Sequence, residues 1–201
     1  MLDQNMPRPL AKGEVRVVLG AQHTAHGRLL PNREALLDAM PKQAVVAEIG
    51  VSAGDFTAQI LARCDVRRLH LVDAWEGPRY ASDLDVVQRR FAEAIASSVV
   101  EIDQGLSETV LATFPDAYFD WVYIDSDHSY DVTARELDIC RRKVKLSGMI
   151  AGHDFCKGNI LKRLPYGVIE AVNEFCVAEN WAYAYLTLES HGHFSFCIRP
   201  L

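Results

Sequence analysis

The stretch at residues 123–133, YIDSDHSYDVT, places four side chains that can do chemistry within seven positions. Three of them are the acids Asp125, Asp127 and Asp131, and the fourth is His128. Carboxylates can hold a divalent cation, and a histidine can accept a proton near neutral pH. The stretch therefore has three possible interpretations: the start of a helix, a metal site, or a catalytic base with its supporting groups.

A second pair of such side chains, His153 and Asp154, lies at the end of the apolar run GMIAGHDF. If this run and the run that ends at Asp125 are neighbouring parallel strands, they lie about 4.8 Å apart. The carboxylates of Asp125 and Asp154 can then share one cation. Carboxylate oxygens suit Mg²⁺, whereas a histidine ligand favours Mn, Fe or Zn. His153 therefore leaves the identity of the metal open.

Apolar runs and helical patterns alternate along most of the chain. Runs with the composition of buried strands lie at 44–50, 68–75, 99–105, 119–125 and 148–155. Segments with helical spacing lie between them, at 55–64, 83–97, 107–114 and 130–144. This alternation predicts an α/β fold, in which helices cover both faces of a doubly wound parallel sheet.

The two ends of the chain depart from this alternation. After a helix at 167–180, two strand patterns at 181–189 and 193–200 flank SHG, which predicts an antiparallel hairpin. The whole sheet is therefore expected to be mostly parallel and seven-stranded, with a C-terminal antiparallel hairpin.

At the other end, the segment 30–40 predicts a leading helix with Asn32 as its cap. Residues 1–29 are expected to form an N-terminal arm or lid. Residues 30–201 are expected to form the single catalytic domain.

The segment AEIGVSAGDFTAQ joins the first strand to its helix and contains Gly50 and Gly54. Glycine lets a backbone turn tightly and approach a ligand, although a simple tight turn explains the same two residues. A dinucleotide-binding loop needs a third glycine, and Asp55 stands where that glycine would be. The acids Glu48 and Asp73 lie at the ends of the first two strands, and such carboxylates favour a cationic ligand over a phosphate.

Five segments in chain order carry a family resemblance: EIGVSAGDFT, LVDAW, DQGLSETV, FDWVYIDSDHSY and LSGMIAGHDF. Together, across residues 30–200, they resemble the class I S-adenosylmethionine-dependent methyltransferases. Ser52 stands where many members carry glycine. Small O-methyltransferases of the catechol and caffeoyl-coenzyme A type, and macrocin-like sugar O-methyltransferases, also lack that glycine. The resemblance implies a Rossmann-like enzyme of this small O-methyltransferase type.

The resemblance also implies which residues bind the cofactor S-adenosylmethionine and a metal. Asp73 is implied as the acid that binds the ribose. The implied metal ligands are Asp125, His153 and Asp154, with Mg²⁺ as the family's ion and Mn, Fe or Zn as alternatives. The implied cofactor-binding residues are Glu48, Gly50, Val51, Ser52, Gly54, Asp73, Ala74, Trp75, Gly105, Leu106, Ser107 and Asp125.

His128 lies three residues after Asp125, an offset that resembles the general base of the macrocin-like enzymes. His128 and Asp125 are therefore the candidate catalytic residues. Histidine titrates near neutrality and can take the proton that an alcohol loses on methylation. A second interpretation places His128 near a helix start, bonded to Asp127 or to a backbone carbonyl. Asp127 and Asp131 are interpreted as structural, because acids near a helix N-terminus suit its dipole.

The expected function is methyl transfer from S-adenosylmethionine to a hydroxyl of a small molecule, a sugar or a phenolic compound, with divalent-metal assistance. Two alternatives stay open. One is a metal-independent methyltransferase that acts on nitrogen or on a peptide, and the other is a non-catalytic relative that binds the cofactor. A nicotinamide dehydrogenase is disfavoured, because the spacing of the glycine loop is wrong for it.

The composition limits which partners and which cellular compartment can be expected for this protein. A chain of 201 residues with a formal net charge of −6 offers no basic face for nucleic acid. The five cysteines have no close spacing, which argues for a reducing compartment rather than a disulfide framework. The sequence has no apolar signal segment and no membrane-length apolar run, so a cytoplasmic protein is expected. An exposed arm and the hairpin edge allow a homodimer.

Overall fold

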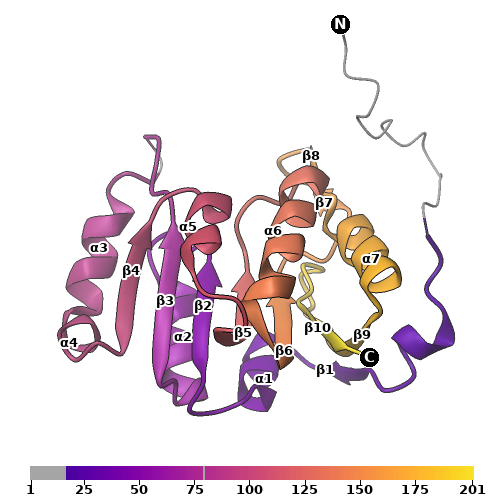
Figure 1. Ribbon diagram of the computed structural model, residues 1–201. Helices are drawn as coiled ribbons and strands as arrows, with labels where there is room; N and C mark the ends of the chain where they lie inside the picture. Colours follow the sequence, from indigo (N-terminus) through magenta and orange to yellow (C-terminus); the bar gives the residue numbers. More distant parts are fainter. Residues whose placement is uncertain (1–16, 79) are drawn as a thin grey trace, which may run out of the picture.

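The computed structural model of the chain describes residues 17–78 and 80–201. Within these residues an eight-stranded sheet has the strand order β1-β9-β10-β6-β5-β2-β3-β4 (Figure 1). Strand β10 runs antiparallel to both of its neighbours, β6 and β9, and the other neighbouring pairs are parallel. The strands of this sheet are β1 (Arg28–Leu30), β2 (Val45–Ile49), β3 (Arg68–Asp73), β4 (Val100–Gln104), β5 (Phe119–Ile124), β6 (Val144–Gly152), β9 (Trp181–Thr187) and β10 (Phe196–Pro200).

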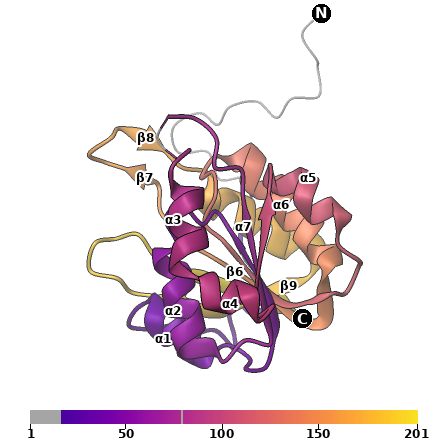
Figure 2. The same ribbon diagram turned by 90° about the vertical axis from the view of Figure 1, so that its left-hand side faces the viewer.

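Helices cover both faces of the sheet, as Figure 2 shows. Helices α5, α6 and α7 pack over one face, and α1, α2 and α3 pack over the other. The doubly wound, Rossmann-like fold predicted from the sequence is therefore confirmed. The helices are η1 (Ala21–His23, a 3-10 turn), α1 (Arg33–Ala39), α2 (Asp55–Cys64), α3 (Asp83–Arg90), α4 (Ala92–Ala96), α5 (Ser107–Thr113), α6 (Tyr130–Lys143) and α7 (Val168–Glu179).

The sheet has one strand more than the seven predicted. The additional strand, β1, pairs in parallel with β9 at the edge of the sheet. It is three residues long, and two of the three are exposed. A segment this short shows no alternating pattern, so the sequence does not distinguish it from a loop. The first sixteen residues of the predicted N-terminal arm lie outside the described residues.

The predicted helix at 83–97 is two helices, α3 and α4, which meet at Phe91. The backbone of Phe91 leaves the helical conformation, with φ of −110° and ψ of 22°. Its ring is buried and packs on Gly54, where an added Cβ would come within 2.6 Å of the Phe91 ring. The break therefore serves the packing of Phe91 against the glycine loop, a contact between distant segments.

The segment at 156–167 carries a small antiparallel pair, β7 (Gly158–Asn159) and β8 (Leu164–Pro165), which is separate from the main sheet. The predicted C-terminal hairpin is present as β9 and β10, but its second strand begins at Phe196 rather than at residue 193. The preceding residues fold towards the end of β6, where Phe155 N donates to Phe194 O at 2.9 Å. This contact lengthens the connecting loop.

The order of the strands fixes the position of a crevice. From β2 the chain moves outward to β3 and β4, and then returns to add β5 on the other side of β2. Ligands of open parallel sheets bind outside the carboxyl ends of the strands at this reversal. The ends of β2 and β5 are joined there by Asp125 N, which donates to Ile49 O at 2.7 Å.

In the part of the chain that the structure describes, no helix combines the length and the apolar character that crossing a membrane requires.

Candidate functional site

The glycine loop between β2 and α2 lies against the end of β5. Gly50 has a φ of +88°, a conformation that favours glycine. A Cβ added at Gly50 would lie 2.2 Å from the carbonyl oxygen of Asp125, which is far inside van der Waals contact. Gly50 therefore permits the close approach of the loop to Asp125. Gly54 also has a positive φ, of +80°, and accommodates the Phe91 ring.

The carboxylate of Asp73 holds this loop in place. Its Oδ2 accepts from the backbone N–H groups of Val51 and Ser52, at 2.7 and 2.9 Å. Its Oδ1 accepts from Trp75 N at 2.8 Å. A carboxylate oxygen can accept two hydrogen bonds, so Oδ1 keeps capacity for one ligand hydroxyl. Asp73 is thus a structural support of the loop as well as the predicted ribose-binding acid.

The indole of Trp75, which follows the end of β3, also stabilises the glycine loop. The ring is 3% exposed, and its Nε1–H donates to the backbone oxygen of Ser52 at 2.9 Å. Both Ser52 and Trp75 have positive φ values, of 51° and 47°, which these hydrogen bonds stabilise. Trp75, implied by the resemblance as a cofactor-binding residue, therefore also closes the end of β3 and holds the glycine loop.

Glu48 lies in the middle of the sheet beneath the loop and is 1% exposed. Thr57 on α2 donates its hydroxyl to Glu48 Oε2 at 2.6 Å. Burial, with smaller contributions from the nearby carboxylates of Asp125 and Asp73, raises the pKa of Glu48 to about 8, against the lowering effects of Thr57 and Arg33. Three acids at neighbouring strand ends therefore repel one another, and a cationic ligand would stabilise their charged forms.

Replacement of Glu48 by glutamine is expected to remove a pH-dependent loss of stability. The pKa of Glu48 is about 8 in the folded protein, against 4.5 for a glutamate exposed to solvent. Between these values the unfolded chain releases a proton that the folded chain retains, so the free energy of unfolding falls as pH rises. Relative to Glu48→Gln, the wild type should lose on the order of 2 kcal/mol between pH 6 and 8.

Urea denaturation of both proteins at several pH values measures this difference. Glu93→Gln, an exposed substitution on α4, is the control for the change in formal charge. Parallel stability curves for wild type and Glu48→Gln would contradict the assignment of a protonated Glu48.

The implied cofactor-binding residues Gly105, Leu106 and Ser107 follow β4. Gly105 N donates to Asp73 O at 2.9 Å, and Gln104 Nε2 donates to Ala74 O at 3.3 Å, so this segment is tied to the end of β3. Leu106 is 62% exposed and precedes α5, which leaves an apolar side chain open beside the crevice.

The resemblance implied that Ser107 binds the cofactor, but the structure shows its hydroxyl bonded to an acid of α6. Ser107 is the first residue of α5 rather than its cap, and it forms a side-chain hydrogen bond with Glu136. Glu136, on α6, is fully buried and also accepts from the Ser126 hydroxyl at 2.6 and 2.8 Å. Burial raises the pKa of Glu136 to about 7, against the bonds from these serines. The sequence analysis missed Glu136, which lies within an ordinary amphipathic helix pattern.

His128 lies between the two acids that were expected to share a cation. Its Nε2 is 2.7 Å from Asp154 Oδ2 and 3.6 Å from Asp125 Oδ1. One donor atom from each of Asp125, His128 and Asp154 lies within 4.8 Å of the others. The ring of Tyr166 stacks on the imidazole, with centroids 4.5 Å apart. The structure thus brings together the predicted base and two of the three predicted metal ligands.

The charges of these groups are strongly coupled. Burial lowers the pKa of His128, but hydrogen bonds to Asp125 and Asp154 outweigh this and raise it to about 9. Burial raises the pKa of Asp154, but hydrogen bonds from His128 and His193 outweigh this and hold it well below its usual range. His128 is therefore a stronger base than a free histidine, and its neutral form predominates only in alkaline solution.

His153, the third predicted metal ligand, points elsewhere. Its Nδ1 is 3.0 Å from the hydroxyl of Ser195, which is also 3.0 Å from the hydroxyl of Tyr123. Burial lowers the pKa of His153. Among the described residues, its ring nitrogens belong to neither group of side chains with metal-ligand spacing.

Asp127 and Asp131, the remaining acids of the opening stretch, lie at the start of α6. Asp127 Oδ1 accepts from Ser129 N at 2.7 Å, and Ser129 caps the helix by accepting from Val132 N. Asp131 lies in the first helical turn. Both positions fit the predicted structural role.

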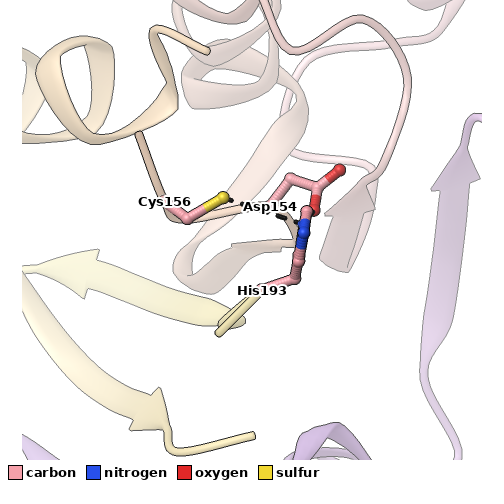
Figure 3. Close-up of side chains that lie close together, drawn as sticks. All are labelled: Asp154, Cys156 and His193. Carbon is pink, nitrogen blue, oxygen red and sulfur yellow. Dashed lines mark hydrogen bonds and ion pairs between the residues drawn. The ribbon is translucent and has the colours of Figure 1, made fainter. Parts of the chain in front are cut away.

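Two further groups near the site were missed. Arg33 on α1 places its guanidinium 3.9 Å from Asp125 Oδ2 and 4.7 Å from the centre of the Phe56 ring. His193, in the loop between β9 and β10, contacts Asp154 Oδ1 and lies 3.7 Å from Cys156 Sγ (Figure 3). The sequence HGH at residues 191–193 is the one feature of the sequence that could have drawn attention to His193. Nothing in the sequence indicated that His193 would contact Asp154.

Comparison with known proteins bears on this arrangement. A family model described as a methyltransferase domain matches residues 47–155, which is more than half of the chain. The matched region begins in β2 and contains the glycine loop, Asp73, Asp125, His128 and Asp154. No curated protein sequence matches the chain.

Solved structures with the same fold include three with known names. The O-methyltransferase TomG of Streptomyces achromogenes, involved in tomaymycin synthesis and solved with S-adenosylmethionine, is 19% identical, with a TM-score of 0.62 over 84% of this chain and 80% of TomG. The tRNA methyltransferase TrmK of B. subtilis is 13% identical, with a TM-score of 0.61 over 86% of this chain and 67% of TrmK.

The third is the pyocyanin biosynthetic protein PhzM, at 14% identity and a TM-score of 0.61 over 80% of this chain. The chain spans about half the length of PhzM, with 51% covered. At these identities the similarity establishes the fold, and acceptors as different as tRNA occur on it.

Proposed function

The chain belongs to the methyltransferase-domain family, and we propose that it transfers a methyl group from S-adenosylmethionine to a hydroxyl of a small molecule, a sugar or a phenol. Its fold is that of the class I S-adenosylmethionine-dependent methyltransferases. One observation carries the choice of a hydroxyl acceptor. His128 lies between Asp125 and Asp154 at the crevice, where a base can take the proton that an alcohol must lose.

The residues of the crevice fit a cationic nucleoside ligand. Glu48, Asp73 and Asp125 lie at the ends of neighbouring strands, where the charges of Asp73 and Asp125 raise the pKa of Glu48, and a positive charge would offset this effect. Asp73 fixes the glycine loop through the backbone N–H groups of Val51 and Ser52, and the free position on its Oδ1 suits a ribose hydroxyl. When bound, S-adenosylmethionine supplies a methyl group activated by a positive sulfur.

His128 is the proposed base. In this assignment Nε2 accepts the proton of the acceptor hydroxyl as the oxygen–methyl bond forms and the sulfur–methyl bond breaks. The carboxylates of Asp154 and Asp125 stabilise the imidazolium that results, because both lie within 3.6 Å of Nε2. The ring of Tyr166, stacked on His128, offers a flat surface for a cyclic acceptor.

Asp125 and Asp154 are the proposed ligands of a divalent cation. Two carboxylates suit Mg²⁺, which keeps several waters in its coordination shell. One oxygen of each acid and His128 Nε2 all lie within 4.8 Å of one another, a spacing that the ligands of one ion can have. A cation there would lower the pKa of the acceptor hydroxyl.

Removal of divalent metal is expected to lower the turnover number at least about tenfold and to leave cofactor affinity nearly unchanged. Calorimetric titration with S-adenosylmethionine, with and without Mg²⁺ after chelator treatment, measures the affinity. Mass spectrometry of a panel of sugar, phenol and amine acceptors measures methyl transfer.

Each alternative function predicts a different result. Turnover that is unchanged by chelator, with methylation of amines, would favour the metal-independent enzyme. Cofactor binding without methylation of any acceptor would favour a non-catalytic relative. Failure to bind S-adenosylmethionine at all would overturn the proposal.

A further inference from the structure

A second group of donor atoms lies on the far side of Asp154 from His128. It consists of Asp154, Cys156 and His193, whose donor atoms all lie within 4.8 Å of one another. Two of the three follow β6, and His193 comes from the loop between β9 and β10 (Figure 3). The bond from Phe155 N to Phe194 O, at 2.9 Å, holds these two segments side by side. The backbone therefore fixes the positions of the three side chains.

Asp154 and Cys156 both contact the same ring nitrogen of His193. Asp154 Oδ1 contacts Nδ1, and Cys156 Sγ lies 3.7 Å from the same atom. A thiol–histidine–carboxylate relay would need one partner at each ring nitrogen, because the proton must enter at one and be held at the other. Burial and the Asp154 carboxylate also raise the pKa of the Cys156 thiol, which disfavours a nucleophile. The group is therefore not arranged as a catalytic triad.

The spacing is close to that of ligands around a tetrahedral metal ion. Zinc bonds of about 2.3 Å to sulfur and about 2.0 Å to nitrogen, at a tetrahedral angle, place the two donors roughly 3.6 Å apart. The observed separation of Cys156 Sγ and His193 Nδ1 is 3.7 Å. Asp154 Oδ1 lies nearer to Nδ1 than two ligands of one ion would, so this carboxylate must move outward.

We infer that Asp154, Cys156 and His193 form a binding site for a thiolate-accepting divalent ion, of which Zn²⁺ is the best match. Sulfur, imidazole and a single carboxylate are the donors that zinc uses, whereas Mg²⁺ demands oxygen. Three protein ligands leave a fourth position for water or for an acceptor group. Such an ion would also tie the β9–β10 loop to the end of β6.

This site is distinct from the proposed magnesium position. Asp154 directs Oδ1 towards His193 and Oδ2 towards His128, so the two positions share one carboxylate and no other ligand. Cys156 and His193 can therefore be replaced without touching Asp125 or His128. The inference goes beyond the proposed function and does not depend on methyl transfer.

Titration of the chelator-treated full chain with Zn²⁺ and with Co²⁺ tests the inference. Calorimetry should show one zinc-binding event that Cys156→Ser and His193→Ala each weaken by at least about 100-fold, beyond the loss typical of an outer-shell residue. Bound Co²⁺ should give a thiolate-to-metal charge-transfer absorption that Cys156→Ser and Cys156→Ala both abolish. His26→Ala, which removes an exposed histidine, should bind zinc as the wild type does.

Two outcomes would overturn the site. In one, Cys156→Ser and His193→Ala bind zinc as tightly as the wild type. In the other, zinc binding is lost in Asp125→Asn and His128→Ala but kept in Cys156→Ser, which assigns the ion to the magnesium position instead. Circular dichroism of each variant separates loss of a ligand from loss of the fold. Cofactor titration of the same variants reports separately on the proposed function.

Discussion

Replacement of His128 by alanine is expected to lower kcat for methyl transfer by about 100- to 10,000-fold, the range that a general base supplies. The affinity for S-adenosylmethionine should stay within about threefold of the wild type, because the imidazole of His128 contacts Asp125, Asp154 and Tyr166 rather than the glycine loop. Quenched assays with the best acceptor, together with cofactor calorimetry, separate the two quantities.

The pH dependence distinguishes a base from a structural histidine. Neighbouring carboxylates raise the pKa of His128 to about 9, and only its neutral form accepts a proton. Without added metal, wild-type kcat should therefore rise with pH towards about 9, and His128→Ala should lack this limb. His191→Ala, at an exposed histidine of the β9–β10 loop, is the matched control and should keep the wild-type profile. Wild-type kcat in His128→Ala would remove His128 from the mechanism.

Replacement of Asp73 by alanine is expected to weaken S-adenosylmethionine binding by about 10- to 150-fold, because a charge-assisted hydrogen bond contributes about 1.5–3 kcal/mol. Asp73 accepts from three backbone N–H groups, those of Val51, Ser52 and Trp75. Without the carboxylate, the glycine loop loses the anchor that holds Ser52 and Trp75 at positive φ. The free energy of unfolding should fall by about 3 kcal/mol, since each unpaired N–H group has a desolvation penalty.

Asp83→Ala is the matched control for this prediction. Asp83 is also an acid that bonds to the loop, but among the described residues its carboxylate accepts from the Ser52 hydroxyl alone, at 2.9 Å. Its removal should change the free energy of unfolding by less than about 1 kcal/mol. Equal effects of the two substitutions, or unchanged cofactor affinity in Asp73→Ala, would show that the three backbone bonds do not organise the binding loop.

The sequence predicted the architecture because its signals are local and periodic. Continuous apolar runs such as the one at β2 predict strands buried on both faces, and every residue of β2 is buried. Alternation of strand and helix then predicts a parallel sheet, which brings the carboxyl ends of the strands to one edge. That is why Glu48, Asp73 and Asp125 could be assigned to one crevice before the structure was known.

The break at Phe91 and the short edge strand β1 escaped the same reasoning. Both depend on contacts between distant segments: Phe91 packs on Gly54, and β1 pairs with β9. No periodic pattern within the segment itself encodes such a contact.

The sequence placed His128 near Asp125, but only the tertiary structure decided that His128 and His193, rather than His153, meet Asp154. The backbone of Asp154 has a φ of +53°, so the extended backbone of β6 ends before it. The side chains of His153 and Asp154 therefore point in different directions. His153 therefore turns to Ser195, while His128 and His193 approach the two oxygens of Asp154. His193 is 39 residues from Asp154 in the chain. The loop that contains His193 is held near Asp154 by a backbone hydrogen bond from Phe155 N to Phe194 O. The sequence by itself determined the acids at the carboxyl ends of the strands and the histidine at residue 128, because these signals are local. The folding of the loops alone placed His193 and Cys156 beside Asp154, because that contact joins segments far apart in the chain.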